Sequence, residues 1–235
     1  MKLYFFTLLG AFVFMALGEA AAESNQNAAS IEQIGEGQMV AVDQQGTSVK
    51  NGAEIGQKGT DNEAGIDQSG FDGGNEAFIT QDGIGNSATI SQTGAGFFAN
   101  DAAVTQFGSE NSAFILQQGT GGTNVATVAQ EGGANQASIL QNYLGALMPQ
   151  NSASIAQNGA RNSAEISQDG SGHEADIEQT GSDNSGTIEQ SDSNQKAILK
   201  QFGDNNSWNI EQSGVAGGIT VEQYGSGGGV SIQQY

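Results

Sequence analysis

The stretch that decides the fold is Asn86-Ser87-Ala88-Thr89-Ile90-Ser91-Gln92-Thr93-Gly94, which has the pattern N-x-A-x-I-x-Q-x-G. Its fixed positions alternate with variable ones, and side chains alternate between two faces along a β-strand. The fixed Asn, Ala, Ile and Gln therefore share one face, and the variable polar residues share the other. The glycine that follows is typical of a turn. Each unit is thus a short strand followed by a tight arc.

The same unit recurs eighteen times between residue 27 and residue 235. Every unit has Gln at its seventh position and a branched aliphatic residue at its fifth. The spacing between units alternates between 11 and at least 13 residues up to Asn151, and is 11 from there on. Repetition at a nearly fixed period is the signature of a stacked repeat architecture.

The alternating spacing predicts two kinds of arc, and hence two strands per coil. We therefore expect an all-β fold, a parallel β-solenoid of about nine coils with two parallel sheets face to face, as in amyloid. Parallel strands need a crossover connection. In this arrangement the second strand of each coil, with its two arcs, supplies that connection.

The fixed face provides the candidate core and ladder residues. In-register stacking places each Gln over the Gln of the next coil, so that the side-chain amides can form continuous ladders, as in steric zippers. Because a buried amide without a partner is costly, each coil is expected to depend on its neighbours. The residues singled out are Gln33, Gln57, Gln81, Gln92, Gln106, Gln117, Gln157, Gln168, Gln179, Gln212 and Gln234, with Asn62, Asn86, Asn111 and Asn162, and with Ile31, Ile90, Ile166 and Ile232.

Composition argues against several function classes. The chain has 235 residues, a net charge of −20, no Cys and a single His, His173. Without Cys there is no disulfide, thiolate metal site or cysteine nucleophile, and one His argues against a histidine metal site or a catalytic triad. The acidic balance argues against nucleic acid as a partner. We expect no enzyme activity, no cofactor, no metal and no small-molecule substrate.

Residues 1–22 have the pattern of a secretory signal peptide. Lys2 provides a positive start, residues 3–17 are apolar, and Ala20–Ala22 offer small residues for cleavage. The alternative is a membrane anchor, for which the apolar run is short. The expected organisation is a signal peptide at 1–22, a short tail at 23–26 and a repeat solenoid at 27–235, in a secreted protein.

Three local features depart from the repeat. Four acidic residues at outward positions of the end coils are candidate gatekeepers, which would slow premature stacking: Asp43, Asp67, Glu189 and Glu211. The alternative is that they only maintain solubility. Segment 142–150 is the longest arc and is expected to loop out between coils five and six. Trp208 occupies an inward position that is usually Ala, so the coil is expected to be wider there, or its arc bent.

The sequence resembles the curlin repeat of curli subunits, the extracellular functional amyloids of bacteria. The signature of that family, close to Q-x-G-x-x-N-x-A-x-x-x-Q, is present at 81–92 and at 157–168, and the resemblance covers about 27–235. It implies a self-assembling subunit of a cell-surface fibre, or fimbrium, that supports biofilm and adhesion. It further implies a related nucleator or major subunit as partner, and an outer-membrane secretion pore.

Two routes to function remain open from the sequence. Uncapped strand edges at the ends of a solenoid invite another copy to add, which favours a fibre subunit. The alternative is a soluble secreted β-solenoid that binds a surface or a polysaccharide ligand.

Overall fold

The computed structural model describes residues 2–6, 12–16, 26–47, 50–71, 74–95, 99–120, 122–144 and 150–235, which form β-strands and contain no helix. The predicted cleavage position after Ala22 and tail residues 23–25 lie outside the described residues. The strands are β1 (Lys2–Phe6), β2 (Phe12–Ala16), β3 (Ala28–Glu36), β4 (Met39–Thr47), β5 (Gly52–Thr60), β6 (Glu63–Phe71), β7 (Glu76–Ile84), β8 (Ser87–Ala95), β9 (Asp101–Ser109), β10 (Ser112–Thr120), β11 (Asn124–Gly133), β12 (Gln136–Leu144), β13 (Asn151–Ala160), β14 (Ser163–Ser171), β15 (Glu174–Ser182), β16 (Ser185–Ser193), β17 (Lys196–Phe202), β18 (Ser207–Gln212), β19 (Gly218–Tyr224) and β20 (Gly229–Gln234).

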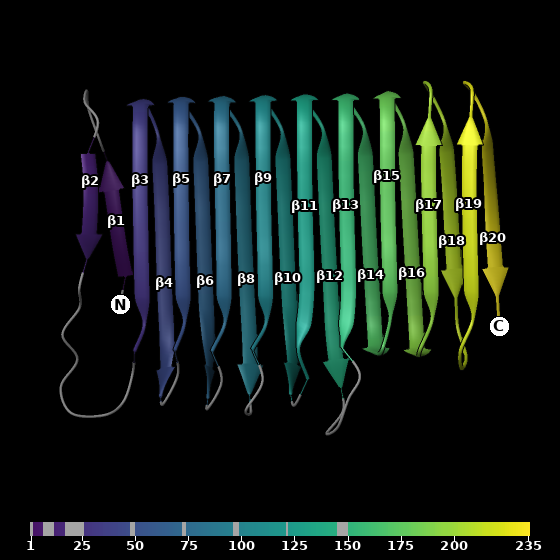
Figure 1. The fold of residues 1–235 in the computed structure, drawn as a ribbon, viewed down its shortest axis with the longest axis horizontal. Coiled ribbons are helices and arrows are strands. Elements are labelled where there is room, and N and C mark those ends of the chain that lie inside the picture. Colours follow the sequence, from purple (N-terminus) through teal and green to yellow (C-terminus); the bar gives the residue numbers. More distant parts are fainter. Residues whose placement is uncertain are drawn as a thin grey trace.

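The strands form two ten-stranded sheets, one from even-numbered and one from odd-numbered repeat strands (Figure 1). The first is ordered β1-β4-β6 and so on to β20, and the second runs from β2 and β3 to β19. One strand of each sheet, β1 or β2, precedes the repeat, which leaves nine repeat strands in each. The predicted all-β parallel solenoid of about nine coils, with two facing sheets, is confirmed.

Neighbouring repeat strands are parallel and in register. Ile115 of β10 pairs with Ile90 of β8 and with Ile139 of β12, and the same holds along both sheets. The aliphatic and alanine positions meet between the sheets as one buried cluster. Alanine occupies little space beside each isoleucine, so the sheets approach closely, and most of this core is removed from water.

The arcs explain the two spacings. Where two strands are separated by only two residues, the first of these takes a left-handed backbone conformation, as at Gly37 (φ 66°), Asp61 (φ 54°) and Ala134 (φ 55°). From Gly172 onward (φ 74°), the arcs on the other side of the coil adopt the same short form. The change coincides with the point in the sequence at which all spacings become 11 residues.

Strands β1 and β2 lie against the first coil. Strand β1 pairs antiparallel with β4, and β2 pairs antiparallel with β3 (Figure 1). They therefore cover the edge at which the repeat solenoid begins. Within the described residues, no helix is long and apolar enough to cross a membrane.

The prediction for segment 142–150 is wrong in its first part. Asn142–Leu144 continue strand β12, and Tyr143 is only 1 % exposed. The tyrosine takes the turn-glycine position of its unit, and its ring lies where a side chain at Gly122 would be: a Cβ there would be 2.6 Å from Tyr143 Cε1. Burial of the aromatic ring therefore holds these residues in the sheet. Residues 145–149 lie outside the described residues.

Candidate assembly interface

Two rows of glutamine side chains bond the coils to one another. In the even-numbered sheet, Gln92 Nε2 donates to Gln117 Oε1 at 2.9 Å, and Gln117 Nε2 donates to Gln141 Oε1 at 2.9 Å. The second N–H of Gln117 donates across the core to the carbonyl oxygen of Asp101 at 3.0 Å. From Gln44 to Gln190, each amide in the row is thus satisfied by a neighbouring coil and by the opposite sheet, as buried polar groups require.

An asparagine row runs along the even-numbered sheet beside the arcs. Asn111 donates from its backbone N and from Nδ2 to Asn86 Oδ1, both at 3.1 Å, and its Nδ2 also donates to Gly132 O. The corresponding row of the odd-numbered sheet is less regular. It is interrupted at Asn124, whose buried Oδ1 has no partner among the described residues.

The two kinds of row have opposite directions. Along the glutamine rows each Nε2 donates toward the C-terminal coil, as from Gln33 to Gln57. Along the asparagine rows each bond between two asparagines runs from its donor toward the N-terminal coil, as from Asn86 to Asn62. The two ends of the solenoid therefore present different atoms, which the sequence pattern alone does not reveal.

The structure places the residues singled out from the sequence on the inward face. All are buried except Ile232 and Gln234, which lie in the last strand, where no further coil covers them. The side-chain amides of the glutamines and asparagines among these residues belong to the rows described above. The bonds from glutamine amides to backbone carbonyls of the opposite sheet were not predicted, because strand periodicity carries no information on cross-sheet contacts.

The four candidate gatekeepers point outward and form two stacked pairs. Asp43 is the register partner of Asp67, and Glu189 is the register partner of Glu211, so like charges lie on neighbouring parallel strands. The pairs lie on the even-numbered sheet, in the first two coils and in coils seven and eight.

Opposite charges also stack on the outward faces. Lys200 Nζ lies 2.8 Å from Glu178 Oε2, and this hydrogen bond raises the pKa of Lys200. Asp176 lies nearby, and its partial burial raises the pKa of its carboxyl group. Exposed ion pairs contribute little to stability, so we expect this ion pair to add little to the free energy that holds the coils together.

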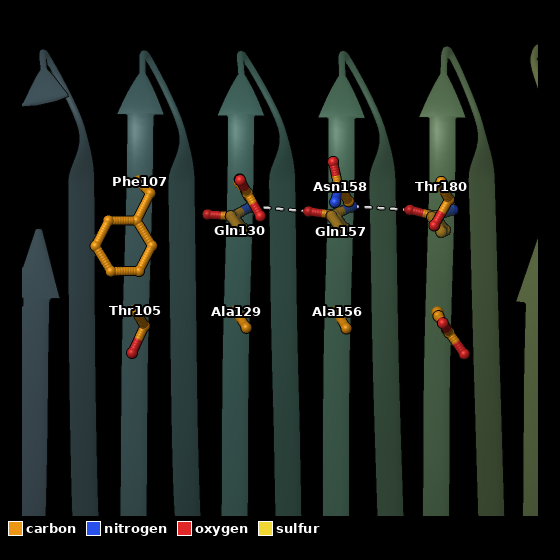
Figure 2. A pocket seen from close by; sticks show the side chains of 11 residues that line it. Thr105, Phe107, Ala129, Gln130, Ala156, Gln157, Asn158 and Thr180 are labelled. Atoms are coloured by element: carbon orange, nitrogen blue, oxygen red, sulfur yellow. Dashed lines mark hydrogen bonds between the residues drawn. The ribbon is translucent and has the colours of Figure 1, made fainter. Parts of the chain in front are cut away.

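A shallow groove lies on the outer face of β9, β11, β13 and β15 (Figure 2). It has a volume of about 370 Å³, with Ala129 and Ala156 at its floor and Phe107 at one end. It arises because two small residues stack between larger ones. In the described part of the chain, no group of three or more His, Asp or Glu side chains could hold a metal ion.

The C-terminal coil departs from the other coils. The asparagine position is glycine at both Gly217 and Gly228. The asparagine row of the even-numbered sheet therefore ends at Asn206, one coil early, whereas in the odd-numbered sheet the last asparagine is Asn151, because His173 and Gln195 take the next two positions. Gln223 lies over Gln201 in register, yet its Oε1 accepts from Trp208 Nε1 and its Nε2 donates to Asn206 Oδ1 at 2.8 Å. The first of these bonds replaces the contact with Gln201 by which the row would continue.

These features define a class of protein: parallel two-sheet β-solenoids in which amide side chains as well as backbone bond the coils. The chain belongs to the curlin-repeat family. The model of the curlin associated repeat matches residues 73–94, 99–124, 150–181 and 181–214, and the two signature stretches at 81–92 and 157–168 lie within these matches. Proteins of this family are structural subunits of extracellular amyloid. Comparison with curated proteins finds none that matches the chain.

Proposed function

We propose that the chain is a subunit of extracellular, curli-like amyloid fibres, which grow by end-to-end stacking of solenoids and support biofilm matrix and surface adhesion. The observation that carries this proposal is the glutamine row of the even-numbered sheet, which runs in register from Gln44 to Gln234. A parallel edge with a matching row is a template for another copy.

The direction of the glutamine rows favours head-to-tail stacking. At the C-terminal end, Gln234 accepts from Gln212, and its Nε2 is the donor by which the row would continue. At the N-terminal end, the rows begin at Gln33 and Gln44, which donate onward to Gln57 and Gln68, so the donors point the same way at both ends. Joining two equal ends would place donor against donor or acceptor against acceptor.

Removal of residues 1–22 would prepare the N-terminal edge. Strands β1 and β2 pair with β4 and β3, so the leader occupies the edge that a second copy needs. A chain that is cleaved during secretion would therefore become competent to stack only after export. By resemblance to the family, an outer-membrane pore and a related nucleator or major subunit are the expected partners.

The test is assembly of the chain lacking residues 1–22, diluted from denaturant and followed by thioflavin T fluorescence and fibre diffraction. We expect growth after a lag, reflections near ~4.8 and ~10 Å, and a shorter lag on seeding with preformed fibres. The full chain is the control and is expected to assemble more slowly, because the leader covers one edge. A monomer that stays soluble for days would instead support the alternative of a ligand-binding solenoid, with the groove at Ala129 and Ala156 as its site.

A further inference from the structure

Trp208 breaks the repeat in β18, one coil before the end at which a second copy would stack. It is the only tryptophan of the chain and takes a position that is Ala in most units. Its indole is partly buried against the core, and its Nε1 donates to Gln223 Oε1. Through this bond, Trp208 of the even-numbered sheet holds a glutamine of the odd-numbered sheet away from its row.

The neighbouring glycine completes the arrangement. A Cβ at Gly228 would lie 1.7 Å from Gln223 Nε2, so the turned amide occupies the space that an asparagine side chain fills in other coils. The φ of Gly228 is not positive, so the backbone there does not itself require glycine. The turned amide therefore explains why the residue at this position has no side chain.

We propose that Trp208, Gln223 and Gly228 form a latch that leaves the C-terminal edge incomplete, so that the joint between stacked copies is weaker than the joints between coils within one copy. This inference rests on the proposed stacking. Within one copy, neighbouring coils of the even-numbered sheet from Asn62 to Asn206 are linked by a hydrogen bond between asparagines in addition to the bond between glutamines. Between two copies, Gly217 and Gly228 have no side chain that could form the asparagine bond. In addition, Gln223 must break its hydrogen bonds with Trp208 and Asn206 before it can continue its row.

The latch is tested by the concentration of soluble chain that remains in equilibrium with fibres, measured in a denaturing buffer that makes it detectable. The variants Trp208→Ala and Trp208→Phe both remove the N–H donor, and the second keeps an aromatic ring in the space. Both are expected to lower the soluble concentration by roughly five-fold, which corresponds to one net hydrogen bond per joint. The matched control is Phe114→Ala, which removes an exposed aromatic ring from β10, in the middle of the solenoid and away from both ends, and should leave the concentration unchanged.

A double-mutant cycle probes the role of Gly228. Gly228→Asn alone should raise the soluble concentration, because the new side chain overlaps the turned amide of Gln223. In the Trp208→Ala background the same change should lower it, because Gln223 can return to its row and the introduced asparagine restores a rung.

Two results would overturn the latch. One is an unchanged soluble concentration in both Trp208 variants; the other is a decrease in Trp208→Ala alone, which would assign the effect to bulk. If instead the wild-type chain forms no fibre with cross-β reflections, the proposed function itself fails, and the latch fails with it.

Discussion

At His173 the asparagine row of the odd-numbered sheet changes its chemistry. The imidazole is 1 % exposed, its Nε2 lies 3.3 Å from the carbonyl oxygen of Asp169, and its backbone N donates to Asn151 Oδ1 at 3.1 Å. Its Nδ1 is buried without a partner among the described residues. Burial lowers the pKa of His173 below its ordinary value of 6.5, and hydrogen bonds to the backbone carbonyls of Asp169 and Asp192 only partly oppose this.

The replacement His173→Asn is expected to make the assembled protein less sensitive to acid. Because the folded pKa is lowered, the unfolded chain binds more protons than the folded chain as the pH falls below 6.5. Stability is then lost with decreasing pH down to the folded pKa, at no more than about 1.4 kcal/mol per pH unit. The measurement is the guanidinium midpoint of fibre dissociation between pH 7.5 and 5, reported as the difference between variant and wild type.

Comparing the variant with the wild type also cancels the effect of a second titrating group, Asp176. The raised pKa of Asp176 makes the folded chain bind more protons than the unfolded chain at low pH, which stabilises it on acidification, and both proteins share this effect. A difference between His173→Asn and wild type that does not grow as the pH falls would contradict the prediction.

At the scale of the element, a row of glycines brings the backbones of successive coils into close contact beside the arcs. Gly132 has φ +111°, a conformation that side-chain-bearing residues rarely adopt, and a Cβ there would lie 2.0 Å from the carbonyl oxygen of Gly159. Equivalent close contacts run from Gly35 to Gly203 along the odd-numbered sheet. The requirement for glycine comes from the backbone angle and from the coil stacked on it.

Gly132→Ala is therefore expected to destabilise the solenoid by about 2 kcal/mol or more, through backbone strain of roughly 1–3 kcal/mol and the overlap with Gly159. Gly56→Ala is the matched control, because Gly56 has no positive φ and a Cβ added there, on β5, would meet nothing within 4 Å. It should change stability by less than about 0.5 kcal/mol. Equal guanidinium midpoints for the two variants would show that the glycine row carries no such strain.

At the scale of the whole molecule, charge opposes stacking. The chain carries a net charge of −20, and in-register pairing turns some of its acids into stacked pairs. Asp43 and Asp67 pair in the first two coils, and Glu189 and Glu211 pair near the other end. Like charges on directly opposed strand positions are destabilising, so these pairs are expected to slow the docking of coils.

Replacing Asp43, Asp67, Glu189 and Glu211 together by Ser is expected to shorten the assembly lag about three-fold, by relieving two like-charge pairs of roughly 0.2–1 kcal/mol each. Thioflavin T kinetics at fixed ionic strength measure this lag. The control replaces Glu54, Glu110, Glu131 and Glu165, four exposed acids outside these two pairs, by Ser. An equal shortening in the control would assign the effect to net charge, and hence to solubility alone.

The two-sheet solenoid and its inward face follow from the sequence because a two-residue period, repeated eighteen times, permits one burial pattern only. Ile90 and Gln92 could be assigned to the inward face in this way, since side-chain alternation along a strand is local geometry. The burial of Tyr143 could not, because the ring fills a space created by Gly122 in the preceding coil.

The repeat pattern is sufficient to predict the number of coils, the face of the sheet on which each repeat side chain lies and the stacking of identical residues. The direction of the amide rows, the pairing of β1 and β2 with the first edge and the diversion of Gln223 by Trp208 depend instead on contacts between coils and between sheets. The reason is physical: alternation along a strand is set by neighbouring residues, whereas an amide can donate toward either coil. Its choice depends on carbonyl groups and side chains that come together only when the coils and the two sheets have packed.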